Sequence, residues 1–218
     1  MAGIDNLGLF ILAGILLNLT PGPDVLYIVT HALRHGARAG MVAALGITAG
    51  CFVHIAAAAL GVSALMAASS TAFTVLKWAG AAYLFYVGLR LLTSKASSFA
   101  IKSGAAGADA VSATALKSIF FQGFWTNALN PKVALFFLAF VPQFIVPQAE
   151  NTVLAFLLLG LVFNLNGLWV NLGWAMAAAW LARRVAAVQR GMVWLDRLAG
   201  AMFIGFGLKL ALSDNPSP

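Results

Sequence analysis

The stretch Asn18-Leu19-Thr20-Pro21-Gly22-Pro23-Asp24 interrupts an apolar run from Leu7 to Val29 that is long enough to cross a bilayer as a helix. Both prolines lack an amide donor and clash with the preceding turn, and the glycine between them tolerates unusual backbone angles. At membrane depth such a break persists only when it is buried in protein or lines a wet cavity. Asp24 costs about 2.5–3.5 kcal/mol at mid-membrane and is therefore a functional candidate. The alternative is a packing kink that leaves Asp24 at the water interface.

The composition is that of an integral membrane protein. Of the 218 residues, 62% are hydrophobic and only 9% are charged, and the mean hydropathy is +0.94. No soluble domain of this size needs so much apolar surface, so we expect one transmembrane domain over residues 1–218 in a lipid bilayer. The net charge of +7 does not indicate a nucleic-acid partner, because the basic residues lie between apolar segments. The single cysteine, Cys51, excludes an internal disulfide.

Six apolar segments predict an all-α, polytopic bundle of six transmembrane helices. A polar linker rich in Ser, Ala and Gly, at about residues 93–116, separates the first three segments from the last three and should be flexible. The predicted spans run from Leu7 to Val29, Ala39 to Ala67, Val75 to Leu92, Ile119 to Val141, Thr152 to Leu181 and Met192 to Leu212.

The basic residues predict how these spans are oriented. Only Lys77 and Lys209 fall on one side of the membrane, whereas ten basic residues fall in or beside the loops after spans one, three and five. Because cytoplasmic loops carry the excess of Lys and Arg, both termini should be extracytoplasmic and the linker cytoplasmic. The ten residues are Arg34, Arg38, Arg90, Lys95, Lys102, Lys117, Arg183, Arg184, Arg190 and Arg197.

The two halves of the chain resemble each other. Gly14-x-x-x-Asn18-x-Thr20-Pro21 in span one corresponds to Gly123-x-x-x-Asn127-x-x-Asn130-Pro131 in span four. With three spans in each half, residues of about 117–212 must insert upside down relative to residues of about 1–92. Inverted repeats with helices broken at corresponding positions are typical of secondary transporters, whose site lies between the halves near the midplane. Chance similarity among helices rich in Gly, Ala and Leu is the alternative.

The second break, Asn127-Ala128-Leu129-Asn130-Pro131-Lys132, carries a cation about half-way along an apolar span. Lys132 is costly there unless it is paired or wet, although its long stem could also reach the interface. The two breaks thus present one acid and one base from opposite halves, which suits a zwitterion. We predict that a small amino acid binds between Asp24 and Lys132. The predicted substrate-binding residues are Asn18, Pro21, Gly22, Pro23, Asp24, Asn127, Asn130, Pro131 and Lys132.

His54 is the only histidine inside a predicted span. The ordinary pKa of histidine suits a proton relay, so His54 joins Asp24 as a candidate for proton coupling. A hydrogen bond between helices is the alternative role. Cys51 and His54 lie on neighbouring turns of one helix face, but two ligands do not make a metal site. We therefore expect no metal and no cofactor.

The motifs at the two breaks, together with five more between His35 and Phe144, resemble the LysE/RhtB family of bacterial amino-acid exporters, which includes lysine exporters and homoserine/threonine exporters. The resemblance implies six spans, an inner-membrane location and efflux of small amino acids driven by the proton motive force. It leaves the substrate open among homoserine- or threonine-like and other neutral or basic amino acids. The matching motifs, in order over nearly the full length, are Thr20-Pro21-Gly22-Pro23-Asp24, His35-Gly36-x-x-x-Gly40, Gly46-x-x-x-Gly50-x-x-x-His54, Lys77-Trp78-Ala79-Gly80-Ala81-Ala82-Tyr83-Leu84, Asn127-x-x-Asn130-Pro131-Lys132, Phe136-Phe137 and Pro142-Gln143-Phe144.

The predicted function is export of an amino acid by a secondary active transporter, with proton antiport as the expected coupling. Efflux of another small solute or of a metal cation is the alternative among transporters. A membrane-embedded enzyme is the alternative of another class, but the six acids are scattered and no Asp-x-x-Asp, His-Glu-x-x-His or Gly-x-Ser-x-Gly pattern occurs, so we predict no catalytic residue. The Gly-rich second span would either form a homodimer interface or pack inside the protomer.

Overall fold

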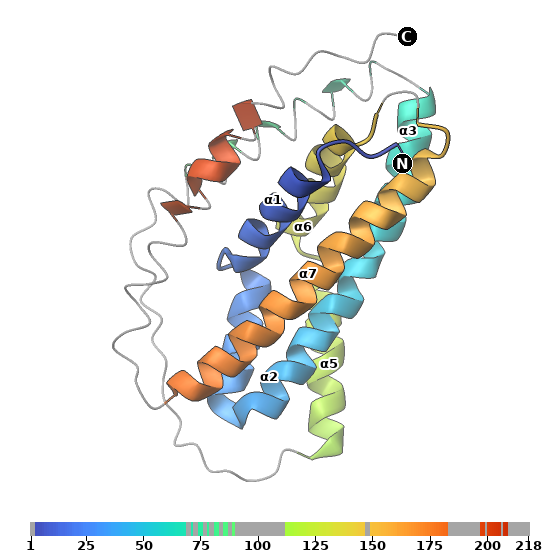
Figure 1. Cartoon of the computed structure of the whole chain (residues 1–218). Coiled ribbons are helices and arrows are strands. Elements are labelled where there is room, and N and C mark those ends of the chain that lie inside the picture. The colour runs from blue at the N-terminus through green and yellow to red at the C-terminus, as the bar shows by residue number, and fades with distance from the viewer. Residues whose placement is uncertain are drawn as a thin grey trace.

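The computed structural model describes residues 3–68, 112–146 and 149–182, together with single residues and short runs between 71 and 89 and between 197 and 208. The described part is helical and contains no strand, only an isolated bridge between Ile4 and Ile145 (Figure 1). The predicted linker, spans three and six and the motif from Lys77 to Leu84 lie largely outside the described residues.

Two described helices, Pro23–Leu65 and Thr152–Leu181, are long and apolar enough to cross a membrane. The bent pair Ala113–Ala128 and Pro131–Phe144 adds a third span if its two helices are taken together. The all-helical, membrane-type architecture predicted from the sequence is thereby confirmed. The count of six spans, the inverted repeat and the orientation of the termini remain predictions.

The first predicted span consists of two helices separated by the break. α1 (Leu7–Leu19) ends there, and α2 (Pro23–Ala57) begins after Gly22, which has an extended backbone. Pro23 fits the first position of α2 because the first amides of a helix have no helical partner to lose. The helix then continues well past Val29, the predicted end of the span.

α2 reverses its direction at Gly36 (Figure 1). The φ of 81° at this residue lies in a region that favours glycine, and a Cβ added there would meet nothing within 4 Å. The turn therefore requires glycine because of its backbone angles and not because a side chain would collide with a neighbour. Beyond it, α2 continues through the π-helical turn η1 (Ala58–Val62) into α3 (Ser63–Ala68), over the region predicted as span two.

The second break also separates two helices. α5 (Ala113–Ala128) starts at the Ser112 cap, six residues before the predicted start of span four. After the break come α6 (Pro131–Leu135), the π-helical turn η2 (Phe136–Phe140) and the 3-10 turn η3 (Val141–Phe144), at an angle of 43° to α5. α7 (Thr152–Leu181) has the bounds predicted for span five and runs across the other helices (Figure 1).

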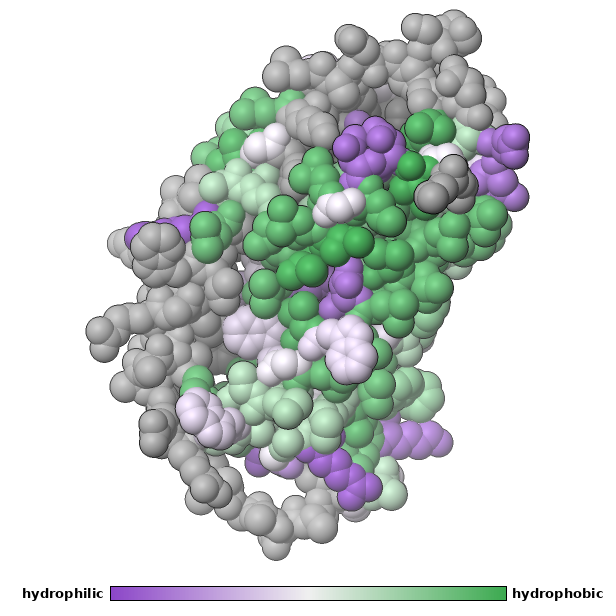
Figure 2. Space-filling view, in the orientation of Figure 1, coloured by the Kyte–Doolittle hydropathy of each residue, from purple (hydrophilic) through white to green (hydrophobic). Residues whose placement is uncertain are grey.

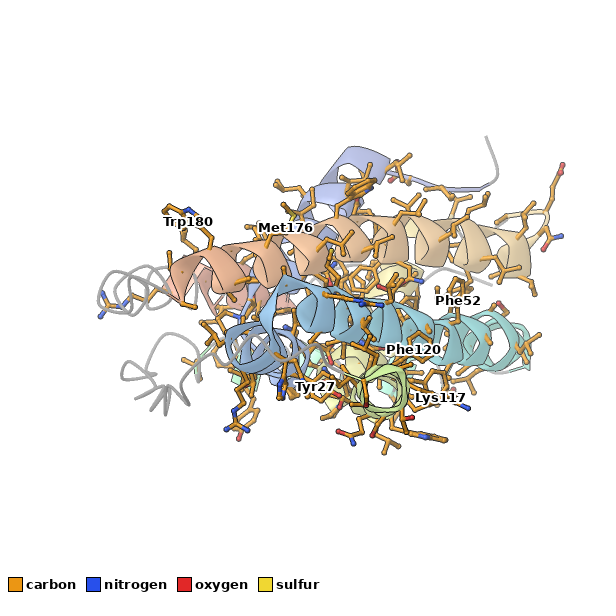
Figure 3. The ribbon with its side chains drawn as sticks, turned by 90° about the horizontal axis from the view of Figure 1, so that it is seen from below. Tyr27, Phe52, Lys117, Phe120, Met176 and Trp180 are labelled. Atoms are coloured by element: carbon orange, nitrogen blue, oxygen red, sulfur yellow. The ribbon has the colours of Figure 1, made fainter. Side chains whose placement is uncertain are left out.

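Glycines allow α2 and α5 to approach closely inside the protomer. A Cβ added at Gly46 would collide with the Phe120 carbonyl, and one added at Gly50 would collide with the Phe124 carbonyl. Figure 3 shows Phe120 between the two helices. The Gly-rich face of span two is therefore internal, and this face does not remain open for a homodimer.

A phenylalanine core packs α1 against the segment that follows the second break. Phe10 of α1 lies against Phe136 and Phe144, and Phe136 lies against Phe163 of α7, with ring centroids 4.6–6.1 Å apart. Phe10 and Phe136 are fully buried. Tilted and edge-to-face ring pairs of this kind fix the relative position of helices, so this core holds the two breaks at the same level.

The outer surface is largely apolar. Hydrophobic side chains cover most of the face in Figure 2, and hydrophilic ones gather mainly near its two ends. On α7, Met176 and Trp180 are exposed and point away from the bundle (Figure 3). Such a surface is suited to lipid contact, because a soluble protein rarely exposes so large an apolar patch.

Candidate functional site

The two helix breaks lie against each other. Asn127 Nδ2 donates to Asp24 Oδ2 at 2.9 Å, which joins the second break to the first turn of α2. Lys132 Nζ donates to the backbone carbonyls of Leu17 and Thr20 at 3.0 Å each, which joins the second break to the end of α1. The structure thus brings Asp24 together with Asn127 and Lys132, which lie more than 100 residues further along the chain.

Each broken helix end is closed by a side chain from the other half of the sequence. A proline leaves the carbonyl four residues earlier without its helical donor, and for the prolines at 21 and 131 these carbonyls belong to Leu17 and Asn127. Leu17 accepts from Lys132, and the Asn127 carbonyl lies 2.8 Å from Nε2 of His54. Each of these carbonyls also accepts from a nearby backbone amide, Leu17 from Thr20 at 3.2 Å and Asn127 from Asn130 at 2.8 Å, so the cross-links supply a second donor at membrane depth.

The two charged residues occupy equivalent places with opposite electrostatics. Each directly follows the proline that begins a helix, at Pro23-Asp24 and at Pro131-Lys132. The N-terminal end of a helix favours an acid and disfavours a cation. Asp24 therefore suits its own helix, whereas Lys132 reaches across to the carbonyl end of α1, where a cation is favoured. Lys132 and His54 also act electrostatically on the Asp24 carboxylate.

Three buried polar atoms of this cluster have no partner at full hydrogen-bond geometry among the described residues, although the Asn130 side chain lies close enough to act on the Asp24 carboxylate as a donor. They are Asp24 Oδ1, Asn127 Oδ1 and Asn130 Nδ2. The side-chain oxygen of Asn130 accepts from the Lys132 amide at 3.0 Å and so caps α6. An unpaired buried polar group costs about 1–3 kcal/mol, which makes these two acceptors and one donor the natural contacts of a bound ligand. Their burial also means that the cluster is closed in this conformation.

The other predicted site residues of the first break have different surroundings. Asn18 donates to the carbonyl of Gly14 in its own helix at 2.9 Å. Its amide also lies against Gly167 of α7, where an added Cβ would be 3.3 Å away. Gly22 leaves room for the lysine ammonium, since a Cβ there would lie 3.3 Å from Lys132 Nζ. Pro21 and Pro23 shape the backbone of the break.

Several contributors were not predicted from the sequence. The carbonyls of Leu17 and Thr20 hold the lysine, and the Leu17 carbonyl could have been found by counting four residues back from Pro21. The ring of Phe137 stacks on His54 with centroids 6.3 Å apart, a contact that no sequence pattern indicated. Among the described residues, no group of three or more His, Cys, Asp or Glu side chains could hold a metal ion.

The family profile described as LysE type translocator matches residues 15–214. This match includes both helix breaks and most of the chain. The chain belongs to the LysE family. The resemblance inferred from the motifs is thereby confirmed.

Relatives of this LysE protein match over nearly their whole length. A homoserine/homoserine lactone efflux protein of Salmonella typhimurium is 31% identical over 206 residues, which cover 93% of this chain and 94% of the relative. A leucine efflux protein of Enterobacter sp. (strain 638) is 29% identical over 209 residues, 96% of each chain. A membrane protein of Vibrio cholerae is 31% identical over 202 residues, 93% of this chain and 94% of the relative. No solved structure matches the chain.

Membership of the LysE family makes this protein a translocator of the bacterial inner membrane and not an enzyme. The apolar helices that are long enough to cross a membrane agree with that location. Efflux is the activity named for the Salmonella and Enterobacter relatives, of homoserine or homoserine lactone in one and of leucine in the other.

Proposed function

We propose that this LysE family protein exports a small neutral amino acid in exchange for protons, and that the amino acid binds between the two helix breaks. One observation carries the proposal. The charged and amide side chains of both breaks converge on one buried cluster that retains unpaired acceptors and an unpaired donor.

The unpaired atoms match the two ends of a zwitterion. The substrate ammonium would donate to Asp24 Oδ1 and Asn127 Oδ1, and the carboxylate would accept from Asn130 Nδ2 and from Lys132. To meet the carboxylate, the lysine gives up a carbonyl of α1. Binding therefore loosens the end of α1, which links occupation of the site to movement of the first broken helix.

The charge of the cluster favours a neutral side chain on the substrate. Asp24 and Lys132 balance each other, so a zwitterion leaves the occupied site neutral. A dibasic amino acid would add a cation that has no matching acid at the breaks, and an unmatched charge at membrane depth is costly.

Proton coupling follows from competition at one carboxylate. A proton on Asp24 removes the charge that holds the substrate ammonium, so proton and substrate exclude each other, as antiport requires. The cross-link from His54 to the Asn127 carbonyl favours a role for this histidine in holding α5 in place. A relay through the same ring remains the second option for His54.

The proposed architecture is a single domain of six spans, with inverted repeats at about residues 1–92 and 117–212 joined by a cytoplasmic linker, and with both termini extracytoplasmic. Each broken helix end is closed by a side chain from the other half of the sequence, which supports this symmetry. Any homodimer would use a surface other than the Gly-rich face, which packs on α5.

Exchange of labelled amino acid across proteoliposomes tests the proposal. Purified protein is reconstituted, loaded with unlabelled leucine or homoserine, and assayed for entry of the labelled form. Asp24→Asn should abolish exchange, whereas Asp5→Asn, at an exposed acid near the N-terminus, should leave it unchanged. Exchange at the wild-type rate by Asp24→Asn would show that the carboxylate does not bind the substrate. Failure of the wild type with a broad panel of amino acids would favour another solute.

A further inference from the structure

Three ring side chains follow Asp24 along one face of α2. Tyr27, His31 and His35 are spaced by four residues, the spacing at which side chains on a helix stand one above another. The ring centroids of Tyr27 and His31 are 4.5 Å apart, and those of His31 and His35 are 5.9 Å apart at an angle of 29°. The rings form a continuous stack from the first break to the turn at Gly36.

The stack changes from half-buried to exposed along its length. Tyr27 donates from its hydroxyl to the Ile119 carbonyl of α5 at 2.8 Å, and Figure 3 shows it beside that helix. His31 is half-buried, and its Nδ1 is buried without a hydrogen-bond partner among the described residues. His35 is exposed. A titratable side chain thus stands between the closed cluster at Asp24 and the end of the helix.

Few charged groups face the stack from neighbouring helices. α7 contains no ionisable residue, and α5 contains only Lys117, which is exposed. On α2 itself, Arg34 and His35 act electrostatically on His31. Among the described residues around the stack, the imidazole rings of His31 and His35 are therefore the side chains that could accept a proton from the site.

We propose that Tyr27, His31 and His35 line the route by which the coupling proton passes from Asp24 to the cytoplasm. This inference rests on the proposed function, because it assigns a path to the proton of the antiport. The proton leaves the Asp24 carboxyl group, a ring nitrogen of His31 accepts it, and His35 or water takes it from there. The carboxylate left behind can then bind the ammonium of the next substrate.

The geometry of the helix sets the length of each step. Asp24 and His31 are seven residues apart, about 10 Å along the axis, so the Tyr27 hydroxyl or water must bridge them. The far end of the stack adjoins Arg34 and Arg38, which predict the cytoplasmic side. An exporter collects its substrate on that side, so the proton would leave where the substrate enters.

A purely structural stack makes a different prediction. Rings that serve only to pack α2 against α5 need no ring nitrogen, and an unpaired buried nitrogen costs about 1–3 kcal/mol that a phenylalanine would avoid. His31→Phe keeps a ring at this position and removes the proton acceptor. His31→Gln keeps polarity and removes the ring. Lys117→Gln, at an exposed position on α5, is the control for a change in charge.

Two assays on the same proteoliposomes separate coupling from transport. Leucine and homoserine are the probes, first in exchange without a gradient and then in uptake driven by an imposed pH gradient. We expect both His31 variants to lower gradient-driven uptake about tenfold or more and to flatten its dependence on pH, while exchange stays near the wild-type rate. Lys117→Gln should resemble the wild type in both assays.

The other outcomes overturn the inference in distinguishable ways. Gradient-driven uptake by His31→Phe at the wild-type rate would show that the stack only packs, and the proposed function would stand. If the wild type exchanges amino acids but does not respond to a proton gradient, both the proton route and the proton antiport are refuted. Absence of exchange by the wild type would refute the proposed function itself.

Discussion

At both helix breaks, a proline begins the second helix and a charged residue follows it, but the two charges have opposite signs. At the first break, Asp24 stays in the first turn of its own helix and accepts a short bond from an amide. At the second, Lys132 leaves its own helix and extends to the carbonyls that end α1. The first break is thus held by a long, flexible side chain, and the second by the compact ring of His54. The first break should be the one that opens more easily.

The largest effect on stability is expected at Lys132, and it distinguishes the role of this residue from that of Asp24. Lys132→Met should destabilise the protein by about 1.5–3 kcal/mol, because the carbonyls of Leu17 and Thr20 lose a charged donor. Asp24→Asn should cost less than about 1 kcal/mol, because the new amide oxygen can still accept from Asn127. Both variants should lose exchange. Thermal unfolding in detergent measures the difference, and equal stability of the two variants would contradict it.

The next effect concerns the rigidity of the second break. Gly50→Ala should cost about 1–3 kcal/mol, because the new methyl meets the Phe124 backbone next to Asn127. Gly61→Ala is the matched control on the same run of helix, since an added Cβ there meets nothing within 4 Å. Thermal unfolding in the same detergent compares them. Similar melting temperatures for the two variants would mean that α5 can move away from α2 freely.

A smaller effect is expected from the ring that closes the second break. His54→Phe should cost about 0.5–1.5 kcal/mol, because the Asn127 carbonyl loses a donor, and His54→Gln should recover part of this loss through its amide. Exchange and gradient-driven uptake by the glutamine variant also test the relay. Loss of coupling with intact exchange would show that His54 carries the proton.

The smallest effect should appear at the first break. Gly22→Ala should change stability by less than about 0.5 kcal/mol, because the new methyl meets only the flexible end of Lys132. The same substitution at Gly50 meets backbone that cannot give way. Unfolding of the two alanine variants side by side measures the contrast between the breaks. A loss at Gly22 as large as that at Gly50 would show that the first break is equally rigid.

Local chemistry made parts of this architecture predictable from sequence. The prolines and glycines indicated both breaks, and the uninterrupted apolar run from Thr152 to Leu181 gave the bounds of α7. The predicted end of the first span, Val29, lies within α2, and His31 and His35 follow it along the helix. In the structure they form a stack on α2, and the helix continues to the turn at Gly36.

The pairing of distant groups could not be predicted in the same way. Counting back from each proline gives the freed carbonyl but not the side chain that fills it, which depends on how the helices pack. Asn18 shows this limit. Its place as a substrate contact stays a prediction, and its bond to Gly14 in its own helix and its contact with Gly167 of α7 are neighbours that the sequence did not indicate.

The opposite charges of Asp24 and Lys132 also determine how the membrane voltage acts on the proposed cycle. When a zwitterion is bound, the acid and the base at the breaks cancel, and the loaded site crosses the field without net charge. When a proton replaces the substrate, Asp24 is neutral and Lys132 remains charged, so the returning site carries one positive charge inward. A potential that is negative inside favours that step by about 2.3 kcal/mol per 100 mV. In this proposed cycle, the voltage therefore acts on the return of the protonated carrier without substrate. The step that exports the amino acid moves no net charge.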